Sequence, residues 1–258
     1  MTELAHGDFT GLAENYSKYR PGYSESVLDM LLAPLARPVG EIELVDVGAG
    51  TGIWTRMLAK RGCRSVIAVE PNDAMRAAGI EDGKGLNIQW IKGNAEETGL
   101  EADSADMLSM ASSFHWADRE KALKEFARVL RPGGRFVALW NPRLINANPL
   151  TAEIEEKLKE MLPALKRVSS GHSGVTKILT TALWESPHYD DVVYVEGRHT
   201  IRQTPEHYQG VWWSVNDIRV QAGEKIFKAF MKYVQDKTHN LDYIETTYQT
   251  RAWTARRV

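Results

Sequence analysis

Short apolar runs alternate with amphipathic segments over the first 140 residues of the chain. The apolar runs predict five strands, at 43–47, 65–70, 87–91, 106–110 and 135–140. Apolar residues recur at helical spacing over 119–130 and over 24–36, where Ser24 is a suitable N-cap. This alternation predicts a doubly wound α/β fold, with a parallel sheet and helices on both faces.

The pattern changes after Asn141-Pro142. Helical spacing predicts helices at 149–162, 176–184, 204–213 and 223–237, and residue alternation predicts strands at 190–196 and 243–255. The last run is rich in Thr, Tyr and Trp, which indicates an edge strand. We expect a single domain over 1–258, with an N-terminal arm at 1–36, a core at 40–142, helical segments at 143–188 and 202–238, and final strands at 189–201 and 241–258.

A glycine turn follows the first predicted strand. Gly48, Gly50 and Gly52 are separated by single residues, and Asp46 precedes them. Such a turn lets backbone N–H groups approach a ligand, because no Cβ atom intervenes. Glu70 ends the second predicted strand, where a carboxylate can accept two hydrogen bonds from a ribose diol. The two segments predict a pocket for a nucleoside-bearing cofactor.

The spacing of the glycines separates two classes of cofactor. A dinucleotide site has Gly-x-Gly-x-x-Gly, whereas the third glycine comes one residue earlier here. A carboxylate at Asp46 would repel phosphate, but it could hold an ammonium group directly or through water. S-adenosylmethionine joins a nucleoside to an amino acid. Its ribose suits Glu70, and its ammonium group suits Asp46. The alternative is a strand–turn–helix unit that binds no ligand.

Several motifs resemble those of class I S-adenosylmethionine-dependent methyltransferases. Residues 45–52 are similar to the first motif of that family, and residues 68–75 are similar to its ribose motif. Residues 93–96 resemble the loop that brackets adenine, and residues 130–134 resemble the turn before the fifth strand. The resemblance covers roughly residues 40–140.

The resemblance implies a Rossmann-like, seven-stranded sheet whose seventh strand is antiparallel and inserted between the fifth and sixth. It also implies a helical insertion between strands five and six and an N-terminal helical arm. Tyr-Arg-Pro-x-Tyr at 19–23 and His115-Trp116 further resemble the small-molecule branch, which includes trans-aconitate-methyltransferase-like proteins.

The matched motifs imply a set of cofactor-binding residues: Asp46, Gly48, Ala49, Gly50, Gly52, Glu70, Pro71, Asn94, Ala95 and Glu96. Relatives often carry Asp at the position of Asn94, whose amide can still pair with the adenine edge once its polarity is assigned. In the resembling family the N-terminal segment folds over the cofactor. Tyr16 and Tyr19 would then face the sulfonium, and Arg20 would bind a carboxylate. A surface helix with aromatic contacts is the alternative.

His115 follows the fourth predicted strand, at the edge where ligands bind in open α/β sheets. Histidine titrates near neutral pH, so His115 is the candidate general base. A role in shaping the pocket is the alternative, because methyl transfer needs a base only when the acceptor must lose a proton. The candidates for acceptor binding are Trp116, Arg143, His172, Trp212 and Trp213. Trp116 could instead pack on adenine or on the next helix, and Trp212 and Trp213 could form subdomain core.

Composition narrows the expected partners. The chain has 32 basic and 34 acidic residues and a formal net charge of −2, which gives no electrostatic reason to expect nucleic acid. Cys63 is the single cysteine, so no intramolecular disulfide and no usual zinc pattern is expected. No run approaches 18 apolar residues and the N-terminus has no apolar signal segment, so we expect a cytoplasmic protein without a membrane partner.

The expected function is therefore methyl transfer from S-adenosylmethionine to oxygen or nitrogen of a small organic molecule, by in-line displacement. The inserted helical segments would form the acceptor-binding lid of a monomer or homodimer. A cofactor binder, or a different reaction on the same scaffold, is an alternative because a fold does not fix the chemistry. An NAD(P)-dependent oxidoreductase is disfavoured by the glycine spacing and by Asp46.

Overall fold

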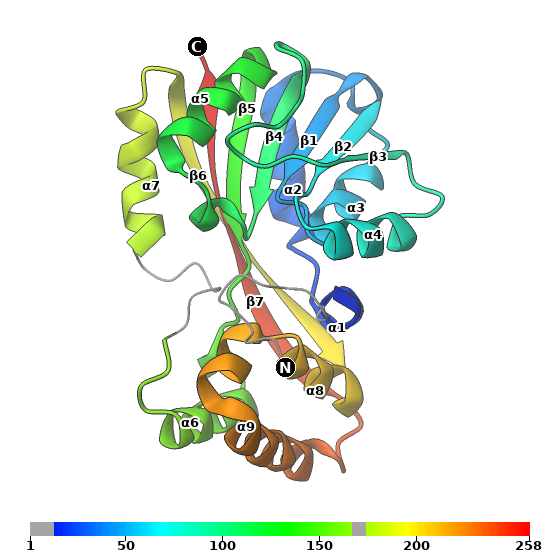
Figure 1. Cartoon of the computed structure of the whole chain (residues 1–258), viewed down its shortest axis with the longest axis vertical. Coiled ribbons are helices and arrows are strands. Elements are labelled where there is room, and N and C mark those ends of the chain that lie inside the picture. The colour runs from blue at the N-terminus through cyan, green and yellow to red at the C-terminus, as the bar shows by residue number, and fades with distance from the viewer. Residues whose placement is uncertain (1–12, 167–173) are drawn as a thin grey trace.

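A seven-stranded sheet forms the centre of the upper body in Figure 1, a computed structural model that describes residues 13–166 and 174–258. The first five strands are parallel, and the sheet order is β3-β2-β1-β4-β5-β7-β6. The strands are β1 (Glu43–Val47), β2 (Ser65–Val69), β3 (Ile88–Ile91), β4 (Ala105–Ala111), β5 (Leu130–Trp140), β6 (Tyr189–Gln203) and β7 (Ile244–Arg257). β7 is antiparallel to both of its neighbours, so the predicted fold class is confirmed.

β7 lies inside the sheet, so the reading of residues 243–255 as an edge strand is wrong. The threonines that suggested exposure are buried and hydrogen-bonded. Thr254 accepts from Arg135 Nε at 3.1 Å, and Thr250 donates to Asn141 Oδ1 at 2.8 Å. The edge strand on this side of the sheet is β6, which pairs with β7 as far as Gln203, well beyond the predicted 190–196. β5 also begins earlier than predicted, because Leu130 already pairs with Ala105 before a register shift.

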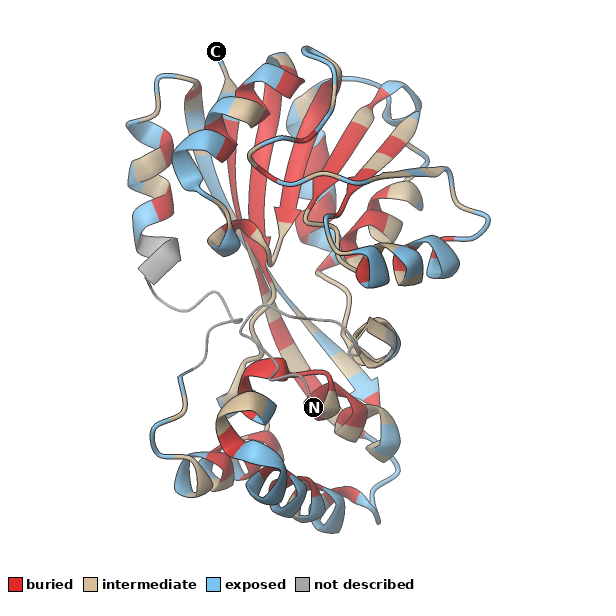
Figure 2. Ribbon diagram, viewed as in Figure 1, coloured by how far each residue is buried: buried red, intermediate tan, exposed pale blue. Residues whose placement is uncertain are grey.

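Helices cover both faces of the sheet. α2 (Glu25–Leu32) and α3 (Ile53–Ala59) share one buried cluster with the strands, and α5 (Arg119–Val129) and α7 (Gly174–Trp184) share the other. Figure 2 shows the buried residues concentrated along the strands between these layers. Ser24 caps α2, as predicted. The helix ends at Leu32 rather than at 36, because Pro34 lacks the N–H group that would continue it. α4 (Asp73–Asp82) begins after the N-cap Asn72.

A second, smaller body lies below the sheet in Figure 1 and has its own core. It contains α6 (Pro149–Met161), α8 (Pro205–Trp213) and α9 (Asn216–Thr238). α9 starts seven residues before the predicted 223, and Gly223, at φ +66°, kinks it. β6 and β7 run from the sheet into this body. α7 packs on the sheet through Leu179 and Leu183, so only the first part of 143–188 belongs to the smaller body.

α1 (Ala13–Tyr19) lies between the two bodies (Figure 1). The ring of Tyr19 contacts that of His207 edge-on at 5.4 Å, and a Cβ atom at Gly210 would lie 2.4 Å from the Tyr19 ring. Arg20 Nε donates to Ser214 Oγ at 2.9 Å. The arm is thus held against α8 and the residue that follows it. Within the described ranges, none of the helices has the length and apolar character to cross a membrane.

Candidate functional site

A cavity of about 360 Å³ opens at the carboxyl ends of β1, β2, β3 and β4. This is the edge at which open α/β sheets bind ligands. Ten of the predicted site residues line it: Tyr16, Gly48, Ala49, Gly50, Glu70, Pro71, Asn94, Ala95, Glu96 and Trp116. Residues more than 60 positions apart in the chain are therefore brought to one wall.

The amides of the glycine turn face β2 rather than the cavity. Gly48 N and Ala49 N donate to Val69 O at 2.8 and 3.2 Å, and Gly50 N donates to Glu70 Oε2 at 2.7 Å. These three N–H groups are therefore engaged within the folded chain, and binding of the ligand by the turn amides stays a prediction. A phosphate cradle needs free N–H groups, and those of Gly48, Ala49 and Gly50 are used within the chain. Gly48 is required at φ +64°, because a Cβ atom there would lie 2.8 Å from the side chain of Ser113.

The Glu70 carboxylate is held by two backbone amides. Oε2 accepts from Gly50 N, and Oε1 accepts from Asn72 N at 2.8 Å. Burial raises the pKa of Glu70, and these two amides lower it. Each carboxylate oxygen can accept more than one hydrogen bond. Both oxygens therefore keep a lone pair for a vicinal diol, and the site fits the sugar of a nucleoside.

Hydrogen bonds within the predicted adenine loop show which side-chain atom of Asn94 is the oxygen and which is the nitrogen. Its Oδ1 accepts from Glu96 N at 3.0 Å and from Glu97 N at 2.7 Å, which leaves Nδ2 as the donor for a ligand. Glu96 Oε1 accepts from Asp118 N at 2.7 Å and so ties this loop to the segment that carries Trp116. Trp116 is 47% exposed in the cavity wall, where the adenine ring of a ligand can pack on its indole ring.

Asp46 and Gly52 lie behind the glycine turn, outside the cavity wall. Asp46 is fully buried and accepts from Thr55 Oγ1 at 2.5 Å and from Ser109 Oγ at 3.2 Å. Burial raises the pKa of Asp46 to about 7. Gly52 packs under Trp90, whose ring would lie 2.9 Å from an added Cβ atom. Neither residue contacts the cavity directly, so the predicted direct contact of Asp46 with an ammonium group is not made.

His115 lies behind Trp116 and does not line the cavity. Its Nδ1 accepts from Trp140 Nε1 at 3.4 Å, and its ring centroid is 4.7 Å from that of Trp116. Nε2 is buried without a hydrogen-bond partner among the described residues. Burial lowers the pKa of His115 to about 4. The geometry disfavours a general base and favours the alternative, a residue that shapes the wall behind Trp116.

We expect the His115 imidazole to remain neutral between pH 5.5 and pH 8. Because burial holds the pKa near 4, protonation should begin only below pH 5. The measurement is an NMR titration of the histidine ring protons, with His115→Gln to assign the signal. A midpoint between pH 6 and 7 would contradict the buried environment and restore the prediction of a general base.

Three further acceptor candidates lie in or beside the smaller body. The Arg143 guanidinium stacks 4.5 Å from the Trp212 ring, with Nη2 3.7 Å from Glu155 Oε1. Trp213 packs edge-on against Phe227 at 4.9 Å. Both tryptophans therefore contribute to the core of that body, and neither they nor Arg143 line the cavity. Tyr19 and Arg20 also lie outside its wall. His172 lies outside the described residues.

Sequence reasoning missed several residues of the wall. Tyr23, Trp54, Met75, Met110, Ser112 and Ser113 all line the cavity. Two of them had a usable signal. Tyr23 belongs to the Tyr-Arg-Pro-x-Tyr segment, and Ser112 directly follows β4 at the ligand-binding edge. The apolar members look like ordinary core residues in the sequence.

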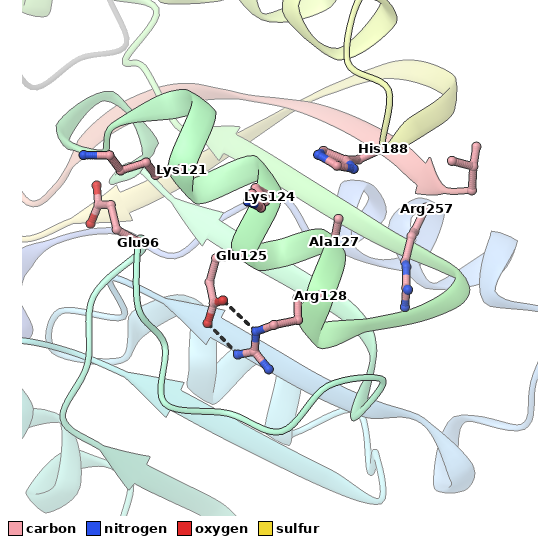
Figure 3. Close-up of a pocket in the computed structure, with 9 residues that line it drawn as sticks. Glu96, Lys121, Lys124, Glu125, Ala127, Arg128, His188 and Arg257 are labelled. Carbon is pink, nitrogen blue, oxygen red and sulfur yellow. Dashed lines mark hydrogen bonds and ion pairs between the residues drawn. The ribbon is translucent and has the colours of Figure 1, made fainter.

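A second hollow, of about 570 Å³, runs along α5 (Figure 3). Its charged groups are largely paired. Arg128 donates to both carboxylate oxygens of Glu125 at 2.7 and 2.8 Å, and Arg257 pairs with Asp103. Within the described part of the chain, no cluster of His, Cys, Asp and Glu could hold a metal ion. The first cavity is therefore the candidate site.

The strand order and the cavity at the carboxyl ends of β1 to β4 define a methyltransferase-type Rossmann-like fold. Residues 45–138 match the family of methyltransferase domains. The chain is similar to an uncharacterized methyltransferase of Mycobacterium tuberculosis (strain ATCC 25618 / H37Rv), at 41% identity over 132 residues, 50% of this chain and 49% of that protein. The chain thus spans about half the length of the first curated relatives that it matches.

Two further similarities cover most of the chain. An uncharacterized methyltransferase of Schizosaccharomyces pombe is 24% identical over 254 residues, covering 95% of this chain and 94% of that protein. A solved structure, a putative type II methyltransferase from Anaeromyxobacter dehalogenans, has a TM-score of 0.69 at 20% identity and covers 92% of this chain and 98% of that chain. The second similarity establishes the fold, and residues 45–138 are similar in sequence to methyltransferase domains.

Proposed function

We propose that the chain is an S-adenosylmethionine-dependent methyltransferase that acts on oxygen or nitrogen of a small organic molecule. One observation carries the choice of cofactor. The glycine turn uses its N–H groups on β2 and Glu70, while Glu70 itself lies in the cavity wall. A pyrophosphate would have to compete for the N–H groups of Gly48, Ala49 and Gly50, which already donate within the chain. An ammonium group instead needs acceptors, and the carbonyl groups of such a turn supply them.

Three residues of the cavity wall bind different parts of the cofactor in this proposal. Glu70 accepts from the sugar hydroxyls, with both of its oxygens fixed by backbone amides. Asn94 Nδ2 donates to the base, and Trp116 packs on it. When bound, S-adenosylmethionine supplies an electrophilic methyl group on a sulfonium centre. The wall mainly has to orient this group and exclude water, because in-line displacement depends on position.

The residues of the cavity wall favour an acceptor whose reacting atom already has a free lone pair and need not lose a proton first. Its titratable residues in the described structure are Tyr16, Tyr23, Glu70 and Glu96. Glu70 is committed to the amides, and burial raises the pKa of Tyr23 far above its ordinary value, so neither is suited to remove a proton. One relative, of Campylobacter jejuni and 27% identical over 150 residues, is named as a ubiquinone/menaquinone biosynthesis C-methyltransferase. A carbon acceptor would need a base to take its proton, and neither Glu70 nor Tyr23 suits that role, so we favour an oxygen or nitrogen acceptor that carries a lone pair.

The acceptor side is assigned to α1 and the smaller body. Tyr16 of α1 lines the cavity, and α1 also packs on α8, which connects the cavity to the smaller body. Trp212 and Trp213 would then support the acceptor side from the core of the smaller body, with Arg143 stacked on Trp212. The near-neutral charge favours a small-molecule acceptor over nucleic acid, and we propose a monomer or homodimer without a membrane partner.

Calorimetry and a transfer assay test this function. We expect heat of binding with S-adenosylmethionine and with S-adenosylhomocysteine, and none with NADH. The same protein should then move a labelled methyl group from the cofactor to a component of a small-metabolite extract. Binding without transfer would favour the alternative of a binder or a different reaction. Absence of heat with both adenosyl ligands would overturn the proposal.

A further inference from the structure

Two hydroxyl groups from distant parts of the chain meet in the cavity wall. The hydroxyls of Tyr23 and Ser112 are 2.9 Å apart, and both residues line the cavity. Tyr23 lies between α1 and α2, whereas Ser112 directly follows β4. The binding roles described above use neither group.

Both residues are held firmly. Ser112 has φ +58°, a left-handed conformation that is uncommon for serine, and its N–H donates to Leu139 O at 2.7 Å. Such backbone outliers persist where the surrounding structure enforces them, often at ligand sites. The Tyr23 ring meets Trp54 edge-on at 5.3 Å, and Tyr23 N donates to Met57 Sδ at 3.3 Å. The phenol oxygen is therefore fixed from both ends of the side chain.

The strand order locates this pair along a bound cofactor. Along the binding edge, the strands run β3, β2, β1 and β4. Asn94 follows β3, Glu70 follows β2, the glycine turn follows β1, and Ser112 follows β4. Asn94 marks the base and Glu70 the sugar. The sulfur of S-adenosylmethionine is bonded to C5′, which is attached to the sugar ring on the other side of the ring oxygen from the base. The sulfonium therefore lies beyond Glu70, towards β1 and β4.

We propose that Tyr23, positioned by Ser112, faces the sulfonium methyl group and discriminates the charged cofactor from its neutral demethylated product. This inference rests on the proposed function. If the Tyr23 hydroxyl donates to Ser112 Oγ, its oxygen lone pairs are directed away from that proton and can face a cation. The aromatic ring adds a negative face. Burial raises the pKa of Tyr23 well above its ordinary value, so the residue stays neutral and acts as a positioning residue, not as a base.

Tyr16 is the competing aromatic group in the wall. Its ring already holds a cation, because the Arg20 Cζ atom lies 4.9 Å from the Tyr16 ring centroid. A second cation against that ring would be repelled by the guanidinium. The arrangement therefore favours Tyr23, whose ring packs on Trp54 rather than under the guanidinium, as the tyrosine that faces a sulfonium.

The test compares the affinities of each variant for S-adenosylmethionine and S-adenosylhomocysteine by calorimetry. Tyr23→Phe should weaken S-adenosylmethionine binding about tenfold and change S-adenosylhomocysteine binding less than about twofold. Ser112→Ala, which leaves Tyr23 unoriented, should reduce the ratio of the two affinities about threefold. Tyr16→Phe is the matched control and should leave the ratio unchanged. Trp116→Phe, at the base end, should weaken both ligands equally.

Each outcome has a distinct meaning. Equal losses for both ligands in Tyr23→Phe overturn the inference while leaving the proposed function intact. A change of ratio in Tyr16→Phe alone also overturns it, because the sulfonium would then lie at Tyr16. Absence of binding by the unmodified protein overturns the proposed function instead. Circular dichroism and thermal unfolding check that the variants fold, and Ser112→Ala decides the question if Tyr23→Phe does not fold.

Discussion

Glu70→Ala is expected to weaken S-adenosylmethionine binding by at least about 100-fold. The substitution removes the proposed acceptor for two sugar hydroxyls, and a hydrogen bond to a charged group contributes about 1.5–3 kcal/mol. It also leaves Gly50 N and Asn72 N without the partner that each has in the folded chain. Because Gly50 belongs to the glycine turn, the loss extends beyond the sugar. Isothermal titration calorimetry measures the dissociation constant directly.

Two variants make this result specific. Glu70→Gln keeps the side-chain shape but replaces one acceptor oxygen with an NH2 group, which would face the N–H of Gly50 or Asn72. We expect an intermediate loss, of about tenfold. Glu97→Ala removes an exposed acid from the neighbouring loop, outside the cavity wall, and should change affinity less than about twofold. Micromolar affinity retained by Glu70→Ala would contradict the assignment of Glu70 to the sugar.

The sequence predicted the first four strands well because their signals are local. β1 coincides with the predicted 43–47, and β2 and β3 differ by a single residue. The position of β7 could not be read in this way. A sequence of alternating threonines is the same for a solvated edge strand and for a strand inside a sheet. The two cases are distinguished by whether a residue from a distant part of the chain forms a hydrogen bond with the threonine hydroxyl. For Thr254 that partner is Arg135, 119 positions away.

The residues of the candidate site also fall into those with a local sequence signal and those whose position depends on distant residues. Glu70 was found because it directly follows a strand at the binding edge, and Asn94 because its loop resembles a family motif. Tyr23 was missed because its role depends on Ser112, 89 positions later. The direction of the turn amides was also hidden, since Val69 O accepts two of them only when β1 and β2 pair in the observed register. His115 looked like a base because sequence does not reveal the burial that lowers its pKa.

Asp46 gives the folded chain an unusual dependence of stability on pH. Its carboxyl is fully buried between Thr55 on α3 and Ser109 on β4, near the Glu70 carboxyl. Burial raises its pKa from 3.8 to about 7. The folded chain therefore binds this proton more tightly than the unfolded chain does. The contribution of Asp46 to the free energy of unfolding is most favourable at low pH, and it falls as the pH rises from about 4 to about 7.

Asp46→Asn cannot titrate and should therefore gain stability relative to the unmodified chain as the pH rises. Between pH 5 and pH 8, the difference in unfolding free energy should move in favour of the variant by about 2–3 kcal/mol, at about 1.4 kcal/mol for each unit of displaced pKa. Urea denaturation of both proteins at four pH values measures the difference. Thr55→Val removes a donor that lowers the pKa of Asp46, so its stability should fall over a window displaced to higher pH. A difference that stays constant from pH 5 to pH 8 would mean that Asp46 is ionised throughout, and that its charge is compensated in the folded chain by more than the two hydroxyls.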